Sequence, residues 1–99
     1  MIVSFRHKGL KRFYEDDDRS KLPAAMLDRI QDILVILDDL TELKSIDRPT
    51  YKLHALKGEL KLFHAVTVRA NWRIIFRFDN KNIYDLDLID YHCGKLKCL

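Results

Sequence analysis

The chain has 99 residues, of which 47% are hydrophobic and 33% charged, with only three Gly and two Pro. This balance predicts one folded domain spanning residues 1–99, with disorder expected only at the C-terminal tail. Apolar runs stay well below the roughly 20 residues that a membrane-spanning helix needs, and the N-terminus lacks the apolar core of a signal peptide, so we expect a cytoplasmic protein.

The net charge of +3 is unevenly distributed. Residues 1–50 contain nine Lys and Arg against ten Asp and Glu, whereas residues 51–99 contain nine against five. Within Tyr51–Arg77, six basic residues accompany a single acid, Glu59. Such an excess is typical of a surface that binds phosphate, and equally of an ordinary solvated face.

The N-terminal segment predicts a short strand and a helix. Ile2–Phe5 alternates apolar and polar residues, and Lys8–Asp17 carries Leu10, Phe13 and Tyr14 at helical spacing. The acidic run Asp16–Asp18 should end this helix, because carboxylates at a helix C-terminus oppose the macrodipole. The run lacks the glycine and the spaced oxygen ligands of a calcium loop, so we interpret it as solvated.

A longer helix is predicted after Pro23, which suits a first helical turn because its missing N–H would be unpaired there. Apolar residues then recur at helical spacing along one stripe formed by Met26, Leu27, Ile30, Ile33, Leu34, Leu37 and Leu40. We expect this stripe to cover a sheet. Val35 and Ile36 lie outside it, which indicates either a second packed helix or a partner protein.

Leu62–Phe78 predicts a β-hairpin at the centre of that sheet, with its turn at Arg69–Asn71. Trp72, Ile74, Phe76 and Phe78 alternate with Arg73, Ile75 and Arg77, so one face is apolar and the other carries arginine. In the first arm the apolar face should receive Leu62, Val66 and Val68. The expected register places Val68 opposite Trp72, Val66 opposite Ile74 and Thr67 opposite Arg73.

Two further strands are predicted, at Tyr51–Leu56 and Ile83–Ile89. In the first, His54 shares the polar side with Lys52. In the second, matching apolar rows pairs Phe78 with Tyr84, Phe76 with Leu86 and Ile74 with Leu88. That register sets Asp85 opposite Arg77 as a structural pair and assigns Arg73, opposite Ile89, to function. The expected fold class is α+β, with two N-terminal helices on one face of a mainly antiparallel, twisted sheet of four to five strands.

Titratable and phosphate-binding residues gather on the polar face and its rim: His54, Lys57, Arg73, Asp90, Tyr91 and His92. No catalytic-triad order, Gly-rich phosphate loop or metal-ligand spacing competes with them. Together they can perform phosphodiester transfer in RNA without metal or cofactor. A base takes the 2′-OH proton, cations stabilise the phosphate, and an acid protonates the leaving 5′-oxygen. Tyr91 can stack on an unpaired base, and Lys52, Lys61 and Arg69 can add RNA contacts.

The remaining titratable groups have ordinary explanations. His7 and His64 are expected to be solvent-exposed or hydrogen-bonded, with His64 at the edge of the apolar face. Cys93 and Cys98 form neither a disulfide framework nor a zinc-binding spacing, so we expect reduced thiols in a frayed tail at 93–99.

Three blocks, YKLHALKG at Tyr51–Gly58, NWRI at Asn71–Ile74 and DYH at Asp90–His92, resemble the HigB-type toxins of the RelE/ParE superfamily. The resemblance covers almost the whole chain. It implies a ribosome-dependent mRNA endonuclease that cuts codons in the decoding site and is silenced by a HigA-like helix-turn-helix antitoxin. It also implies a catalytic histidine at His54, phosphate-binding cations at Lys57 and Arg73, and a C-terminal catalytic group at Asp90, Tyr91 and His92.

Two other classes of function remain open at this point. ParE-type relatives use the same fold as non-catalytic inhibitors of DNA gyrase, and a basic RNA-binding module without chemistry is a weaker third reading. The combination of His54, Lys57, Arg73, Tyr91 and His92 favours the enzyme, because an inhibitor has no need of all five.

Overall fold

A computed structural model describes residues 1–90, so Tyr91, His92 and the predicted tail with its two cysteines lie outside the described residues. The regular elements are α1 (Lys8–Asp16), α2 (Leu27–Asp38), β1 (His54–Ala55), β2 (Phe63–Arg69), β3 (Trp72–Asp79) and β4 (Asn82–Asp90). Three short 3-10 turns accompany them: η1 (Ala24–Met26), η2 (Leu43–Ser45) and η3 (Gly58–Leu60).

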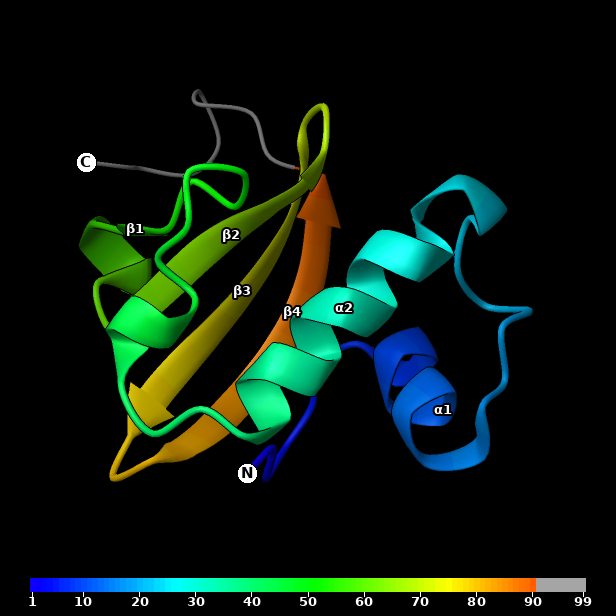
Figure 1. Cartoon of the computed structure of the whole chain (residues 1–99), viewed down its shortest axis with the longest axis horizontal. Coiled ribbons are helices and arrows are strands. Elements are labelled where there is room, and N and C mark those ends of the chain that lie inside the picture. The colour runs from blue at the N-terminus through cyan, green and yellow to red at the C-terminus, as the bar shows by residue number, and fades with distance from the viewer. Residues whose placement is uncertain (91–99) are drawn as a thin grey trace.

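The four strands form one antiparallel sheet in the order β1-β2-β3-β4. Figure 1 shows α2 crossing one face of this sheet, with α1 beside it, and β1 at the opposite edge from β4. The predicted architecture is therefore confirmed.

The predicted first strand is reduced to two isolated parallel bridges, from Ile2 to Ile83 and from Phe5 to Leu86. Between these bridges the ladder is interrupted, because Asp85 adopts a left-handed φ of 54° and donates its N–H to the Ser4 hydroxyl. The predicted strand at 51–56 is likewise shorter than expected. Lys52 has a left-handed φ of 50° and donates its N–H to the Arg48 carbonyl, so this part of the segment is a turn.

The stripe of α2 forms the core as predicted. All of its residues are buried except Leu27, which is half-buried, and they pack with Leu10 and Phe13 of α1 against Val66, Ile74 and Phe76 of the sheet. Burial of each such side chain contributes roughly 1.5–3 kcal/mol to folding. Of the two residues outside the stripe, Ile36 packs against the core, while Val35 is 59% exposed.

The central hairpin has the predicted register over most of its length, because Val66 pairs with Ile74 and Thr67 with Arg73. The expected Val68 and Trp72 pair is wrong: a bulge shifts the ladder by one residue, and Arg69 opposes Trp72. The assignment of Leu62 to the apolar face is also wrong. Leu62 is 65% exposed because β2 begins one residue later, at Phe63.

The pairing of β3 with β4 matches the prediction at Arg73 with Ile89, Ile74 with Leu88 and Ile75 with Asp87. Beyond Ile75 a bulge changes the register, so Phe78 pairs with Ile83 instead of Tyr84, and Arg77 faces Tyr84. The predicted contact survives this shift. Arg77 Nε donates to Asp85 Oδ2 at 2.8 Å.

The sheet face away from the helices is less polar than predicted. At its centre lies a second hydrophobic cluster of Leu56, Phe63, Ala65 and Ile75, with Leu60 and Ile89 packed against it. Leu60 belongs to η3, so this short turn shields part of the face from water. Arg73 and Arg77 therefore flank an apolar centre.

The Arg77 and Asp85 pair should stabilise the fold modestly. Both side chains are about one third exposed, at 35% and 38%, so solvent screens their attraction. We expect a double-mutant cycle of Arg77→Ala and Asp85→Asn in urea unfolding to give a coupling free energy of roughly 0.2–1 kcal/mol. Asparagine is chosen because it tolerates the left-handed backbone at position 85. Strictly additive effects would show that the pair contributes nothing.

His64 should make stability depend on pH. Its ring stacks on Phe76 with centroids 5.9 Å apart, and burial lowers the pKa of His64 below its ordinary value of 6.5. The unfolded chain then binds the proton more readily than the folded one, so stability is complete above pH 6.5 and is lost as the pH falls toward the folded-state pKa. Urea unfolding between pH 8 and 5 should show a smaller loss for His64→Gln than for the wild type. Equal slopes would contradict this.

Candidate functional site

His54 lies on the sheet face opposite the helices. In β1 it pairs with Ala65, and the same row continues through Ile75 to Asp87. Directly opposed residues share a face, and Ala65 and Ile75 belong to the second hydrophobic cluster. The His54 ring is half-buried, and its Nδ1 lies 2.9 Å from the Lys52 carbonyl oxygen. A carbonyl can only accept, so Nδ1 carries a proton and Nε2 is the accepting nitrogen of the neutral ring.

Arg73 lies on the same face, opposite Thr67 of β2. Strand β2 lies between His54 on β1 and Arg73 on β3, so the backbones of these two strands are separated by about 10 Å. Along β2, the partners of His54 and Arg73 are Ala65 and Thr67, two residues apart. The Arg73 side chain turns toward the hairpin end, where Nη1 donates to the carbonyls of Ala70 and Trp72. The prediction that His54 and Arg73 lie on the sheet face away from α2 is confirmed by this register.

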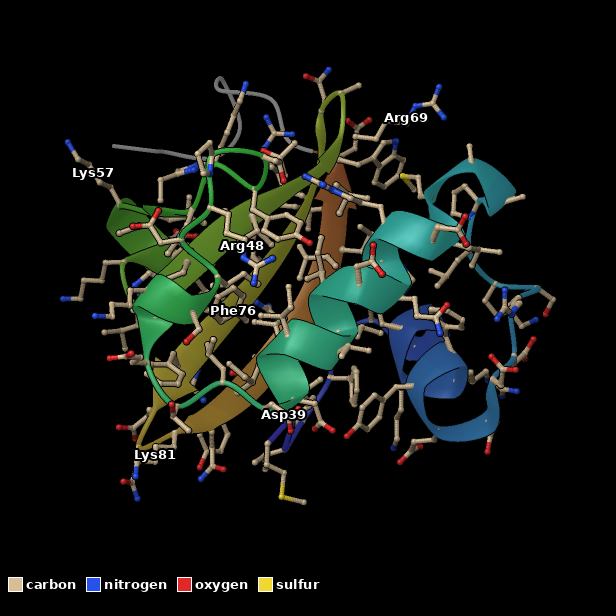
Figure 2. The ribbon with its side chains drawn as sticks, in the orientation of Figure 1. Asp39, Arg48, Lys57, Arg69, Phe76 and Lys81 are labelled. Atoms are coloured by element: carbon tan, nitrogen blue, oxygen red, sulfur yellow. The ribbon has the colours of Figure 1, made fainter. Side chains whose placement is uncertain are left out.

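Four other predicted cations, Lys52, Lys57, Lys61 and Arg69, are exposed. Lys57 precedes η3, and Figure 2 shows it beside β1, while Arg69 lies at the tip of the β2–β3 hairpin. Within residues 1–90, no carboxylate forms an ion pair with any of these four side chains. Their charge is therefore available to attract phosphate.

The C-terminal group is only partly described. Asp90 is exposed at the end of β4 and pairs with Trp72, so it lies at the same end of the sheet as Arg73. Because side chains alternate along a strand, Asp90 lies on the same side of β4 as Leu88, which packs in the core with the helices. Asp90 is therefore at the rim of the sheet and not on the face of His54. Tyr91 and His92 lie outside the described residues.

One residue near the site was not identified from the sequence. Arg29 of α2 donates to the Thr50 hydroxyl and carbonyl and to the Thr67 carbonyl, and it lies over the Tyr51 ring. Two of its three acceptors are backbone carbonyls, which carry no sequence signal. The sequence pattern could not have revealed this contact.

The helical side of the molecule carries a different surface. A cavity of about 250 Å³ between the helices is lined by Phe13, Tyr14, Asp17, Gln31, Leu34, Val35 and Asp38. The Tyr14 hydroxyl donates to Asp38 at 2.7 Å, and this bond, with burial and the Asp38 charge, raises the pKa of Tyr14 to about 12. The carboxylates of Asp17 and Asp38 at this cavity repel phosphate. The cavity therefore differs electrostatically from the basic sheet face.

No helix in the described part of the chain is long and apolar enough to cross a membrane. Among residues 1–90, no three His, Cys, Asp or Glu side chains gather closely enough to hold a metal ion.

Comparison with solved structures shows the same fold in two proteins of low sequence identity. A mutant of YafQ from E. coli superposes with a TM-score of 0.60 at 13% identity, covering 96% of both chains. The YoeB dimer from Staphylococcus aureus gives a TM-score of 0.57 at 18% identity, covering 92% of this chain and 94% of that one.

Sequence comparison gives a closer relationship. Over 92 residues, which are 93% of this chain and 100% of the relative, the sequence is 49% identical to Endoribonuclease HigB of Proteus vulgaris. It is 31% identical over 80 residues to Toxin HigB-1 of Vibrio cholerae, covering 79% of this chain and 84% of that one. The family model of the RelE-like toxin of type II toxin-antitoxin system HigB matches residues 3–92. The chain thus belongs to the HigB-like family of RelE-like toxins of type II toxin-antitoxin systems.

Proposed function

We propose that this protein is an endoribonuclease toxin that cleaves mRNA on the ribosome and so inhibits translation in the cytoplasm. One observation carries the proposal: His54 and Arg73 share the sheet face away from the helices, with exposed lysines beside them. The 49% identical relative that bears the name Endoribonuclease HigB supports the same reaction class.

The proposed reaction begins at His54. With its Nδ1 proton held by the Lys52 carbonyl, the neutral ring accepts the 2′-OH proton at Nε2. The 2′-oxygen then forms a bond to phosphorus while the bond from phosphorus to the 5′-oxygen breaks. An acid of the C-terminal group protonates the 5′-oxygen, leaving a cyclic phosphate and a 5′-OH. His54 is therefore the group we assign as the base.

Arg73 and Lys57 have an electrostatic role in this proposal. Charge develops on the phosphate oxygens in the transition state, and cations held beside that position stabilise it. The guanidinium of Arg73 is suited to two oxygens at once, whereas Lys57 supplies a point charge. The resemblance implies a C-terminal catalytic group at Asp90, Tyr91 and His92, and we place the acid in this group. Tyr91 can also stack on an unpaired base, and Lys52, Lys61 and Arg69 extend the phosphate-binding surface.

The proposed partners are the ribosome and an antitoxin. The exposed cations attract phosphate but do not orient a flexible single strand, so the decoding site would hold the codon against His54 and Arg73. A cognate HigA-like helix-turn-helix antitoxin would silence the enzyme, as membership of a type II toxin family implies.

Substitutions in the site should abolish cleavage while sparing the fold. We expect His54→Ala to lower the cleavage rate on programmed ribosomes by roughly 10²- to 10⁴-fold, the usual range for one proton-transfer group. Arg73→Ala should cost about 10²- to 10³-fold, as for loss of one oxyanion donor, and Arg73→Lys should recover only part of this. His92→Ala should fall in the same range as His54→Ala and remove the other arm of the pH profile.

Matched controls are His64→Gln, which removes a histidine from the opposite sheet face, and Arg12→Ala, which removes an exposed arginine from α1. Both should cleave like the wild type. The 5′ ends of mRNA should be mapped in cells alongside growth. If the wild type arrests growth without codon-phased cleavage, and His54→Ala, Arg73→Ala and His92→Ala remain folded and equally toxic, the protein is instead a non-catalytic inhibitor of the gyrase-binding kind.

Ribosome dependence can be tested separately with purified components. The same mRNA is incubated with the protein either naked or on programmed ribosomes at equal ionic strength. Because the exposed cations supply attraction without orientation, we expect slow, scattered cleavage of naked RNA and rapid, codon-phased cleavage on ribosomes. Equal rates in both reactions would exclude ribosome dependence while leaving the nuclease assignment intact.

A further inference from the structure

We propose that Arg29 is a positioning residue for His54, acting from the opposite face of the sheet. The inference rests on the proposed function of His54, and it concerns how that ring is held. Arg29 belongs to the first turn of α2, whereas His54 lies in β1 on the face away from α2. The segment that joins them, Thr50–Leu53, passes from the helical side to the edge of the sheet.

Arg29 contacts the start of this segment through Nη1, Nη2 and the face of its guanidinium. Nη1 donates to Thr50 Oγ1 at 3.2 Å, and Nη2 donates to the Thr50 carbonyl and to the Thr67 carbonyl of β2 at 3.3 Å. The Cζ atom of Arg29 lies over the buried Tyr51 ring, 4.3 Å from its centroid. One side chain thus ties the loop, the helix and β2 together.

Backbone contacts extend this restraint from Thr50 toward His54. The Tyr51 carbonyl accepts from Thr67 N–H at 2.7 Å, which attaches the loop to the same β2 residue that Arg29 contacts. The next residue, Lys52, has a left-handed φ of 50°. A left-handed backbone is unfavourable for a non-glycine residue and persists only where its surroundings hold it. The contacts of Thr50 and Tyr51 supply that restraint.

Lys52 connects this loop to His54, because its carbonyl accepts a hydrogen bond from His54 Nδ1 at 2.9 Å. The direction of this carbonyl depends on the left-handed turn. If Lys52 relaxed to an ordinary backbone conformation, its carbonyl would rotate away from the imidazole, and the Nδ1–H tautomer would lose its stabilising partner. Arg29 therefore sets which ring nitrogen of His54 accepts a proton.

Alternative roles for Arg29 fit less well. No carboxylate of residues 1–90 forms an ion pair with Arg29, and its Nε is buried without a hydrogen-bond partner among them. Burial of an incompletely bonded guanidinium opposes folding. An apolar side chain would fill the space between α2 and Tyr51 at lower cost. The guanidinium instead meets two acceptors of Thr50, the Tyr51 ring and the Thr67 carbonyl of β2, an arrangement that fixes the loop at Thr50–Tyr51 against β2.

The test uses the full-length protein with Arg29→Met, which keeps the apolar stem, and Arg29→Lys, which keeps the charge. Arg12→Met is the matched control, because Arg12 is exposed on α1. Ring nitrogen NMR, with His54 assigned by its absence in His54→Ala, reports the tautomer directly. We expect the wild type and Arg12→Met to show the Nδ1–H form, and Arg29→Met to show a mixture of both tautomers.

Cleavage on programmed ribosomes supplies the second measurement. We expect Arg29→Met to lower kcat at least tenfold with KM within twofold, because Lys57 and Arg73, the cations proposed to contact the reacting phosphate, are unchanged. Arg29→Lys should recover part of kcat and most of the Nδ1–H tautomer, since an ammonium reaches fewer acceptors than a guanidinium. Arg29→Lys also keeps the test decisive if Arg29→Met does not fold.

Several outcomes would overturn the proposal. An unchanged His54 tautomer in both Arg29 variants does so, even if kcat falls, because the loss would then be structural. A kcat equal to that of Arg12→Met does so as well. Failure of the proposed function looks different: His54→Ala would cleave like the wild type, while the tautomer of His54 would still respond to Arg29.

Discussion

Antiparallel pairing of β2 with β3 is the constraint on which the rest of the structure depends. Because side chains alternate along each strand, the pairing that places Ile74 beside Val66 under the helices also places Arg73 beside Thr67 on the other face. The apolar row and the functional row therefore form together. A slip of one residue would bury Arg73 beneath α2 and expose Ile74, so the packing energy of the core also selects the geometry of the site.

Each of the two ladders of β3 contains one bulge, and both bulges lie near charged groups. At the hairpin end the ladder shifts after Thr67, where Arg73 bonds the Ala70 carbonyl across the turn. At the other end the left-handed Asp85 lets its carboxylate reach Arg77 even though the two residues are no longer directly opposed. Bulges re-aim side chains where a regular ladder would leave them perpendicular to the sheet. Here one bulge orients a cation proposed for catalysis, and the other neutralises a cation that is not.

Charge is segregated between the two sides of the molecule. Residues 1–50, which include both helices, contain ten of the fifteen acids, with Asp17 and Asp38 at the cavity between α1 and α2, while the exposed Lys52, Lys57 and Lys61 flank the short strand β1. A polyanion approaching this field is directed to the sheet. The second hydrophobic cluster beneath that face gives the cations a rigid base, since residues such as Phe63 and Ile75 are buried. Arg29 connects the two sides through backbone contacts.

The local pattern of the sequence determined the element types, the helical stripe, the central hairpin and the faces of His54 and Arg73, because each follows from a periodicity of 3.6 or 2. It also identified the contact of Arg77 with Asp85, and the three sequence blocks identified the family. Only the tertiary structure decided the two bulges, the exposure of Leu62, the apolar centre of the second face and the shortness of β1. The left-handed backbone at Lys52 shortens β1, and the one at Asp85 accompanies the bulge between β3 and β4. The tertiary structure also decided that Arg29 reaches the Thr50 and Thr67 carbonyls. Backbone carbonyls are the same in every residue, so no sequence pattern records which one an arginine will reach.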